Sequence, residues 1–333
     1  MNKALVTGGA GFLGSSIVRE LLDRKARVAV RVLALPNEPT ENLGGLDVEV
    51  VRGNVLDIPS VKRAVDGMDT VFHAAAVYKD FMPDPTPMYD ANLRGTFNVL
   101  EASRRAGVAK VVYTASIVSV GRPRPGDLGD ENTPYDGWAI DFAYGRSKYH
   151  SRILAEDFAN WGLDVRVVCP GVVLGPRDIA PTPSGKVIVN AAKTKIAFYT
   201  DGGASYVDVR DAAAVHVLAA EKGKRGERYL ATEHNLSNRD LVEHIFRALG
   251  KKPRLTKVPY AVARQAVRAL EQRAIRLGVE PPIAAPMFEY TEKPCYYTNA
   301  KARTELGATF RPIEDTLRDA VDYFRTRGLI ARR

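Results

Sequence analysis

Cysteine is scarce in this sequence, and long apolar runs are missing from it. The two cysteines, Cys169 and Cys295, lack the paired spacing of a metal site, so we predict reduced thiols and no bound metal. No apolar run approaches the roughly 20 residues that a transmembrane helix needs. The apolar stretch at the N-terminus is short and interrupted by glycine, which predicts a first strand and not a signal peptide. We therefore expect a cytoplasmic protein.

The sequence also lacks the signatures of nucleic-acid binding. Its 333 residues carry a net charge of +9, which is compatible with nucleic acid, an anionic cofactor or a membrane surface. However, there is no zinc-finger spacing, no RRM signature and no basic run interleaved with aromatic residues, so we expect no nucleic-acid partner. Apolar residues make up 45% and charged residues 26%, as in a globular protein of one large domain or two smaller ones.

The N-terminal segment KALVTGGAGFLG, residues 3–14, joins a short apolar run to a dense cluster of glycines. Gly8, Gly11 and Gly14 are spaced G-x-x-G-x-x-G, which departs from the dinucleotide fingerprint G-x-G-x-x-G in its first interval. Residues without a Cβ atom let the backbone approach a pyrophosphate, which the positive end of the following helix also attracts. The alternative is a plain flexible turn. The apolar run before it and the amphipathic helix after it favour a dinucleotide site.

Strand-like and helix-like segments alternate along most of the chain. This order predicts an α/β fold with a parallel sheet covered on both faces, with ligands at the carboxyl ends of the strands. We predict strands at 4–6, 27–35, 48–52, 70–76, 111–116, 204–209 and 226–231, and a strand that ends in a proline-glycine loop within 165–178. We predict helices at 15–25, after Asp57, at 87–106, 143–161, 211–221 and 260–277, and one that begins with a capping box at Ser237 and Asp240 and ends near Gly250.

Two of these helices have a distinct apolar face. In the segment 87–106, five residues are spaced for one buried face, namely Met88, Leu93, Phe97, Leu100 and Ala102. In the segment 260–277, we expect a solvated arginine face over a buried aliphatic one formed by Val262, Val267, Leu270 and Ile275. The alternative is that this basic helix contacts anionic lipid at a membrane surface.

Tyr144 and Lys148 lie four residues apart in YGRSK and therefore on one face of a predicted helix. A nearby ammonium group favours the phenolate and lowers the pKa of a tyrosine from its usual value of about 10. The pair could therefore donate and accept protons, although a surface tyrosine and lysine show the same spacing. Ser116, at the end of a predicted strand, adds a hydroxyl group.

Together, these motifs resemble those of the extended short-chain dehydrogenases/reductases, in the NAD-dependent epimerase/dehydratase family. The resemblance implies a Rossmann-type doubly wound parallel sheet from residues 1–171 and about 204–232. A smaller, mostly helical C-terminal substrate region would comprise about 172–203 and 233–333. The implied cofactor is NAD or NADP. The motifs are TGGAGFLG at 7–14, HAAA at 73–76, NLRGT at 92–96, YTAS at 113–116, YGRSK at 144–148 and PGVVLGP at 170–176.

The resemblance also implies roles for individual residues. Tyr144 would exchange a proton with the substrate oxygen, Ser116 would hydrogen-bond the same oxygen, and Lys148 would lower the pKa of Tyr144 and bind the nicotinamide ribose. Asn92 would support the site through its helix, unless it is an ordinary buried amide. The implied cofactor contacts are Gly8, Gly11, Phe12, Leu13, Gly14, Leu35, Asn54, Val55, His73, Ala74, Ala75, Tyr144, Lys148, Pro170, Val172 and Val173.

The adenosine end of the expected site leaves the cofactor open. A carboxylate at the end of the second strand selects NAD, and an arginine selects NADP. This chain has Leu35 there, with Arg31 shortly before it and Glu38 shortly after it. The family often has aspartate where this chain has Asn54, whose amide oxygen can still accept a hydrogen bond from adenine.

Within the family, the sequence looks closest to dihydroflavonol reductases, 3β-hydroxysteroid dehydrogenase-like proteins and hopanoid-associated epimerase-like proteins. Dehydratases usually have an Asp-Glu pair where this chain has Ile117 and Val118, and sugar-nucleotide epimerases often have an arginine where it has residues 204–206. We therefore predict an NAD(P)-dependent reductase or dehydrogenase that interconverts an apolar ketone or aldehyde and its alcohol. An NDP-sugar epimerase and a non-catalytic dinucleotide sensor are the alternatives.

The expected partner is a small, lipophilic substrate. Tyr78, Phe81 and Met82 form an apolar cluster near the cofactor groove, and we predict that they contact the substrate together with Ser116. The alternative for the first three residues is simple packing. Homodimers are common among similar proteins, so by analogy we expect a homodimer.

Overall fold

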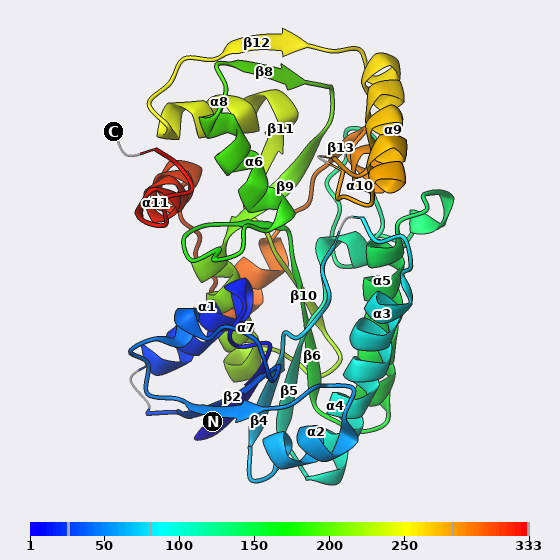
Figure 1. Cartoon of the computed structure of the whole chain (residues 1–333). Coiled ribbons are helices and arrows are strands. Elements are labelled where there is room, and N and C mark those ends of the chain that lie inside the picture. The colour runs from blue at the N-terminus through cyan, green and yellow to red at the C-terminus, as the bar shows by residue number, and fades with distance from the viewer. Residues whose placement is uncertain (25–26, 80, 282, 332–333) are drawn as a thin grey trace.

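A parallel sheet forms the centre of the larger part of the molecule (Figure 1). The computed structural model describes residues 1–24, 27–79, 81–281 and 283–331. Within these ranges, seven strands follow the order β10-β6-β5-β4-β1-β2-β3, and every neighbouring pair is parallel. They are β1 (Lys3–Thr7), β2 (Ala29–Ala34), β3 (Glu49–Arg52), β4 (Thr70–His73), β5 (Lys110–Thr114), β6 (Val165–Pro170) and β10 (Arg228–Ala231). The predicted Rossmann-type sheet is confirmed.

The direction in which the sheet grows reverses at β1. From β1, the chain adds β2 and β3 on one side, and then β4, β5, β6 and β10 on the other. In doubly wound folds, such a reversal leaves a crevice outside the carboxyl ends of the two central strands, and ligands bind there. The crevice of this chain therefore lies at the ends of β1 and β4.

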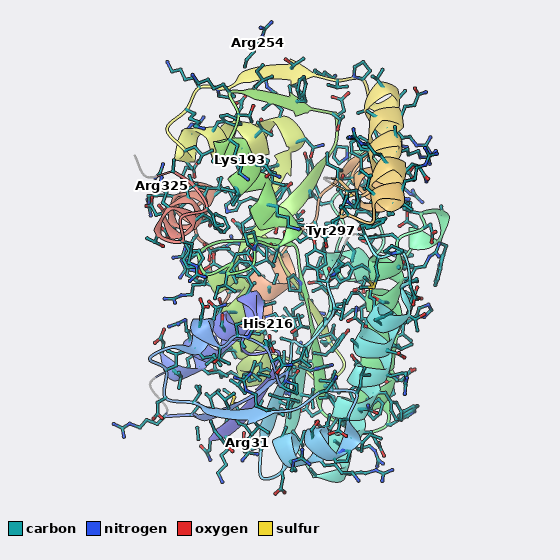
Figure 2. All side chains as sticks on the ribbon, viewed as in Figure 1. Arg31, Lys193, His216, Arg254, Tyr297 and Arg325 are labelled. Atoms are coloured by element: carbon teal, nitrogen blue, oxygen red, sulfur yellow. The ribbon has the colours of Figure 1, made fainter. Side chains whose placement is uncertain are left out.

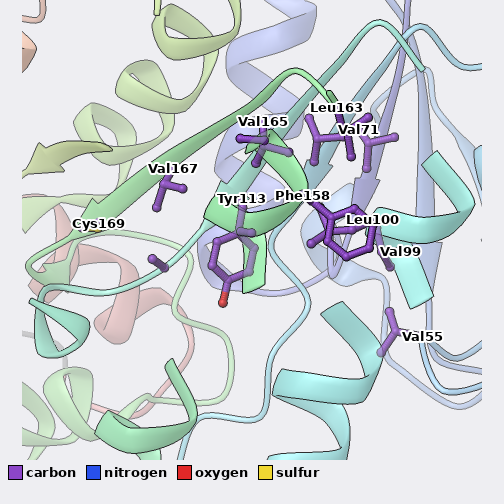
Figure 3. Close-up of a cluster of buried hydrophobic side chains, with 14 of the residues drawn as sticks. Val55, Val71, Val99, Leu100, Tyr113, Phe158, Leu163, Val165, Val167 and Cys169 are labelled. Carbon is purple, nitrogen blue, oxygen red and sulfur yellow. The ribbon is translucent and has the colours of Figure 1, made fainter. Parts of the chain in front are cut away.

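Helices cover both faces of the sheet (Figure 1). One face carries α1 and α7, whose side chains share a buried apolar cluster with the sheet residues Val6 and Val32. The other face carries α2, α4 and α5. Figure 3 shows the buried side chains on that face, where Leu100 and Phe158 pack near Tyr113. These helices are α1 (Phe12–Leu22), α2 (Ile58–Val65), α4 (Gly95–Arg105), α5 (Ala143–Asn160) and α7 (Val209–Lys222).

A smaller region lies beyond the carboxyl ends of the strands. There β9 (Gly203–Asp208) pairs with β7 (Val172–Leu174), β11 (His234–Ser237) and β13 (Pro294–Cys295). A separate two-stranded parallel sheet joins β8 (Ile196–Tyr199) to β12 (Arg254–Lys257). The helices of this region are α6 (Pro183–Ala192), α8 (Asn238–Ala248), α9 (Tyr260–Leu277), α10 (Ala285–Tyr290) and α11 (Ile313–Thr326). An apolar core of its own lies among α6, α8 and α11.

Short helical turns connect several elements. Single 3-10 turns occupy Glu41–Leu43, Ile117–Ser119 and Gly137–Ala139, and a π-helical turn occupies Ala302–Leu306. The predicted N-cap at Ser237 is confirmed, because Ser237 Oγ accepts a hydrogen bond from the backbone N–H of Asp240 at 3.1 Å. The carboxylate of Asp240 accepts from the hydroxyl of Ser237 at 2.7 Å, whereas in a capping box it would accept from the backbone N–H of Ser237. Cys169 and Cys295 are buried free thiols.

The predicted helix at 87–106 is interrupted. It consists of α3 (Thr86–Tyr89), a π-helical turn (Asp90–Arg94) and α4. The π turn adds a residue to one turn of the helix and so shifts the phase of the residues after it. The prediction that Phe97 belongs to the buried face is therefore wrong: its side chain is 45% exposed and touches Phe158 only from outside the core, at a ring-centroid distance of 5.7 Å.

The helix predicted at 260–277 is confirmed as α9, but its aliphatic face is wrong. Val267 is buried, whereas Val262 is 58%, Leu270 is 42% and Ile275 is 46% exposed. The reason is that α9 packs against α10, which has only six residues and covers a narrow strip of it. Across the described ranges, no helix combines the length and the apolar character needed to cross a membrane.

Candidate functional site

The glycine turn connects β1 to α1 at the crevice. Gly8 has a φ angle of +68°, and a Cβ atom at this position would lie 2.8 Å from the Cα atom of Ala75, at the end of β4. A Cβ atom on Gly14 would overlap the carbonyl oxygen of Gly8. Both positions therefore require glycine, because the turn, α1 and the end of β4 approach one another too closely for a side chain.

The start of α1 offers hydrogen-bond donors to an anion. Its N-cap residue, Gly11, supplies no side-chain acceptor, and its first turn contains no acidic residue. The first N–H groups of a helix have no partner within the helix, so those of Phe12, Leu13 and Gly14 can bind a phosphate, aided by the helix dipole. The turn thus fits the diphosphate of a dinucleotide in both shape and charge.

At the adenosine end, two charged side chains hold the backbone that follows β2. The carboxylate of Glu38 accepts a hydrogen bond from the N–H of Leu35 at 3.0 Å. The guanidinium of Arg52, at the end of β3, donates to the carbonyl oxygens of Leu35 at 2.9 Å and Glu38 at 2.7 Å. A carboxylate and a guanidinium therefore lie where ribose hydroxyls or a 2′-phosphate bind, which is compatible with NAD and with NADP.

Three other residues considered for this end are engaged in structural contacts. Arg31 pairs with Glu49 at 2.8 Å and donates to backbone carbonyls, so its charge is used within the fold. The amide oxygen of Asn54 accepts the N–H of Leu56 at 2.9 Å and keeps one lone pair. Val55 is buried.

The end of β4 forms one wall of the crevice. Its last residue, His73, is buried and bonds Thr7 through Nδ1 at 2.7 Å and Thr96 through Nε2 at 3.0 Å. Because the hydroxyl of Thr96 already donates to the carbonyl of Asn92 at 2.6 Å, it accepts from Nε2. Burial, with a smaller effect of Lys148, lowers the pKa of His73 to about 3. A neutral ring with both nitrogens engaged is a wall residue, followed by the half-buried Ala74 and Ala75.

Ser116, Tyr144 and Lys148 come from β5 and α5. Ser116 follows the last residue of β5 and begins a 3-10 turn, in which its Oγ accepts the N–H of Val118 at 3.4 Å. Lys148 lies one helical turn after Tyr144 and is buried, with Nζ 2.6 Å from the carbonyl oxygen of Thr114. Thr114, whose carbonyl oxygen binds Lys148, is the last residue of β5, and Ser116 lies two residues after it.

Burial dominates the electrostatics of Lys148. It lowers the pKa of the ammonium group from 10.5 to about 7, because no carboxylate among the described residues pairs with it. The second partner of Nζ is the hydroxyl of Tyr113, at 3.3 Å. That hydroxyl bonds Ser151 Oγ at 2.6 Å, which in turn donates to the carbonyl of Ser147 at 2.8 Å. Two of the three N–H donors of Lys148 therefore have protein acceptors.

The comparisons with known proteins agree with this geometry. A model of the NAD-dependent epimerase/dehydratase family matches residues 4–231, which is more than half of the chain. The chain belongs to this family. It is therefore an NAD(P)-dependent oxidoreductase of the extended short-chain dehydrogenase/reductase type, and its small-molecule chemistry uses NAD or NADP.

Three similar proteins are a reductase by name, a second reductase and an epimerase. A Synechocystis protein that carries the name dihydroflavonol 4-reductase is 32% identical over 98% of this chain and 95% of its own. The 2-alkyl-3-oxoalkanoate reductase of Stenotrophomonas maltophilia is 30% identical over 92% of this chain and 94% of its own. The crystal structure of a nucleoside-diphosphate-sugar epimerase from Pseudomonas aeruginosa superposes with a TM-score of 0.80, at 28% identity and with 99% of both chains covered.

In this extended short-chain dehydrogenase/reductase, the segment after β6 packs against β9. β6 ends at Pro170, and a Cβ atom on the next residue, Gly171, would lie 2.5 Å from the carbonyl oxygen of Ser205. Val172 and Val173 begin β7 and are half-buried. The predicted nicotinamide loop is thus held close to β9.

The structure brings one of the three predicted apolar substrate residues to Tyr144. The ring of Tyr78 lies 4.6 Å from that of Tyr144, measured between centroids. Phe81 and Met82 are half-buried in the loop that follows, before α3. Phe142 adds a third ring, 5.9 Å from Tyr144.

Sequence reasoning missed four residues around the site. The sequence indicates Asn92 but not the residues that it contacts. Its side-chain amide accepts from the N–H of Val77 at 2.7 Å and donates to the carbonyl of Val77 at 3.1 Å and to Ser147 Oγ at 3.0 Å. The π-helical turn that carries Asn92 is a signal of a functional region, but only the structure shows it. The missed residues are Arg52, Tyr113, Ser151 and His216. The last of these is labelled in Figure 2, and its Nε2 lies 3.0 Å from the hydroxyl of Thr114 at the end of β5.

Proposed function

We propose that this enzyme interconverts an apolar ketone or aldehyde and its alcohol, with Tyr144 as the acid/base. The observation that carries the proposal is the buried Lys148, one helical turn from Tyr144 and hydrogen-bonded to the strand end that presents Ser116. A buried cation beside a phenol favours the phenolate. This arrangement suits proton exchange with a substrate oxygen near neutral pH.

Each residue has a defined part in the reduction. Tyr144 donates its hydroxyl proton to the carbonyl oxygen of the substrate, and Ser116 donates a hydrogen bond to the same oxygen. The third N–H of Lys148 would hold a ribose hydroxyl of the bound cofactor, and the charge of Lys148 stabilises the phenolate that forms on Tyr144. When bound, the nicotinamide supplies the hydride or accepts it. In oxidation, Tyr144 accepts the proton that it donates in reduction.

Two features support an apolar substrate. Tyr78 packs on Tyr144, and Phe81 and Met82 follow it in the same loop; residues 172–203 and 233–333 complete the substrate region. A sugar nucleotide would need a cation for its diphosphate, and Ala204, Ser205 and Tyr206 of β9 supply none and are buried. The name 2-alkyl-3-oxoalkanoate reductase describes a ketone that bears alkyl chains and a carboxylate, and it fits the same reduction of a carbonyl group.

The remaining expectations concern the substrate, the oligomeric state and the cellular location of the enzyme. We propose a lipophilic small molecule as the substrate, a homodimer as the assembly and the cytoplasm as the location. Light scattering on the purified chain tests the assembly, with the mass of a single chain, 36.5 kDa, as the contrary result.

The experiment pairs a substrate panel with two matched variants. NADH or NADPH is mixed with the enzyme and apolar ketones and aldehydes, and loss of absorbance is followed; a UDP-sugar is tested in parallel. Tyr144→Phe should abolish turnover and leave cofactor affinity nearly unchanged. Tyr149→Phe, on the same helix but stacked on Tyr135 at 4.1 Å, should stay active. Turnover of the UDP-sugar with no apolar carbonyl reduced, or full activity of Tyr144→Phe, would contradict the proposal.

A further inference from the structure

The small β8–β12 sheet forms one end of the molecule, opposite α2 (Figure 1). Side chains alternate between the two faces of a strand. Ala197 is buried, on the side where β8 contacts α8, so Ile196 and Phe198 point outward. The register pairs Ile196 with Arg254 and Phe198 with Thr256. These four residues form what we call the β8–β12 face.

Both apolar residues of the β8–β12 face are exposed, and Phe198 is the most exposed large apolar residue in the described part of the chain. Phe198 is 68% and Ile196 is 45% exposed. Figure 2 shows Arg254 projecting from this end, away from the body of the protein. A phenyl ring and an isoleucine on one face of a strand leave contiguous apolar area in water, and exposed apolar patches rimmed by polar residues mark binding surfaces.

The segments that carry the two strands are strongly basic. Residues 193–200 and 251–257 contain six lysines and arginines and no aspartate or glutamate. Lys257 pairs with Asp201 at 2.9 Å, and Lys251 donates to the carbonyl of Ala192. Four cations have no ion pair with any carboxylate in the described part of the chain: Lys193, Lys195, Lys252 and Arg254. The charge around the β8–β12 face is therefore uncompensated.

We propose that the β8–β12 face docks on an anionic lipid surface. Lysines and arginines near such a surface are attracted to its negative potential, while Ile196 and Phe198 enter the boundary between headgroups and acyl chains. A second copy of this chain is a poor occupant, because two basic faces would repel each other. A nucleic acid would leave Ile196 without a partner, since only a planar side chain stacks on bases.

The test measures co-sedimentation of the full-length protein with phosphatidylcholine vesicles that contain or lack phosphatidylserine. Binding should require phosphatidylserine and weaken as salt is added. Ile196→Ser with Phe198→Ser should weaken it at least roughly tenfold, by loss of buried apolar area. Lys195→Glu with Arg254→Glu should weaken it by a similar factor of roughly ten or more.

Two control variants make the same kinds of substitution at other places on the surface, and so test whether binding depends on the β8–β12 face itself. Lys62→Glu with Arg63→Glu makes the same charge change on exposed residues of α2, at the far end of the molecule, and should bind as the unchanged protein does. Leu270→Ser with Ile275→Ser removes exposed aliphatic residues from α9 and should also leave binding unchanged. Loss of binding in either control with none in the β8–β12 variants would overturn the proposal.

A second measurement covers the case in which the serine variants do not fold. Phe198→Trp keeps an aromatic side chain. Its fluorescence, taken as the difference from the unchanged protein with Trp138 and Trp161, should be quenched by brominated acyl chains in phosphatidylserine vesicles. No quenching, equal binding to vesicles without phosphatidylserine, or retention on duplex DNA without vesicle binding would each refute docking on lipid. Because no substrate or cofactor is present, the result is independent of the proposed reaction.

Discussion

The ammonium nitrogen of Lys148 lies 2.6 Å from the carbonyl oxygen of Thr114, the last residue of β5. This contact holds the ammonium group of Lys148, on α5, at the end of the strand that presents Ser116. It also buries the charge, and burial lowers the pKa of Lys148 to about 7. The position that we propose for catalysis therefore costs stability at neutral pH, because the folded protein must either bury the Lys148 cation or release its proton.

Replacement of Lys148 should change how stability depends on pH. The unfolded chain binds a proton at Lys148 below pH 10.5, whereas the folded chain binds it only below about pH 7. The contribution of Lys148 to folding stability therefore improves as pH rises from about 7 to 10.5 and is constant below that window. Between about pH 8 and 9.5, the free energy of unfolding of the unchanged protein should therefore rise by roughly 1 kcal/mol per pH unit relative to that of Lys148→Met. Urea denaturation at several pH values measures this.

The matched control for this experiment is Lys222→Met. The Lys222 ammonium also donates to a carbonyl oxygen, that of Leu306 at 2.9 Å, but its side chain is exposed. All three proteins share the buried tyrosines that titrate at high pH, so the contributions of these tyrosines cancel in the differences in stability. A difference between Lys148→Met and the unchanged protein that stays flat between pH 7 and 10 would show that Lys148 titrates as an exposed lysine does.

Gly14→Ala should weaken dinucleotide binding more than it weakens the fold. The new methyl group would meet the carbonyl oxygen of Gly8 and move the turn away from α1. We expect at least a roughly tenfold loss of NADH or NADPH affinity, about 1.4 kcal/mol, in a fluorescence titration. Gly45→Ala is the control. Unlike Gly14, Gly45 has a positive φ, of 75°, but a Cβ atom there would meet nothing within 4 Å. Its cost of about 1 kcal/mol should appear in stability alone.

Asn92→Ala should loosen the loop that carries Tyr78. The change removes the amide that satisfies both backbone groups of Val77 and reaches Ser147 on α5. Unpaired buried polar groups should cost about 2–3 kcal/mol of stability, and KM should rise more than kcat falls if the loop binds substrate. Asn98→Ala, which loses one bond to the carbonyl of Val55 at 2.9 Å, should cost about 1 kcal/mol. An unchanged KM in Asn92→Ala would contradict a positioning role.

The parts of the fold and site that the sequence predicts are the local ones. Gly8 and Gly14 are recognisable because the requirement for a missing Cβ atom is a property of the turn itself. The spacing of Tyr144 and Lys148 follows from helix geometry. The strands and helices of the sheet follow from apolar periodicity, since each element must bury one face.

The parts that the sequence could not predict depend on contacts between distant elements. Tyr113 is an ordinary residue of an apolar strand until β5 and α5 are packed together, which brings its hydroxyl to Lys148 and Ser151. The side of α4 on which Phe97 lies depends on a π turn, and the periodicity of apolar residues does not reveal that turn. Amphipathic spacing in α9 predicts a buried face only if another element covers it, and α10 is too short.

The last prediction concerns His216, which supports the same strand end from α7. Its Nδ1 donates to the carbonyl of Ala212 at 2.7 Å, so in the neutral ring Nε2 accepts from the hydroxyl of Thr114 at 3.0 Å. Thr114→Val and His216→Phe each remove one side of this bond. Each should destabilise the fold by about 1–3 kcal/mol, and the double variant by about 1 kcal/mol less than their sum.

The pH dependence of stability separates this role from simple packing. Burial lowers the pKa of His216 to about 4, so the unfolded chain takes up a proton at His216 between pH 6.5 and 4 that the folded chain refuses. Stability from His216 is therefore lost as pH falls through this window. His216→Phe should lose less stability than the unchanged protein between pH 6.5 and 4, while His73, buried with a pKa lowered to about 3, contributes equally to both. Parallel pH profiles, or strictly additive variants, would mean that the ring only fills space beneath Thr114.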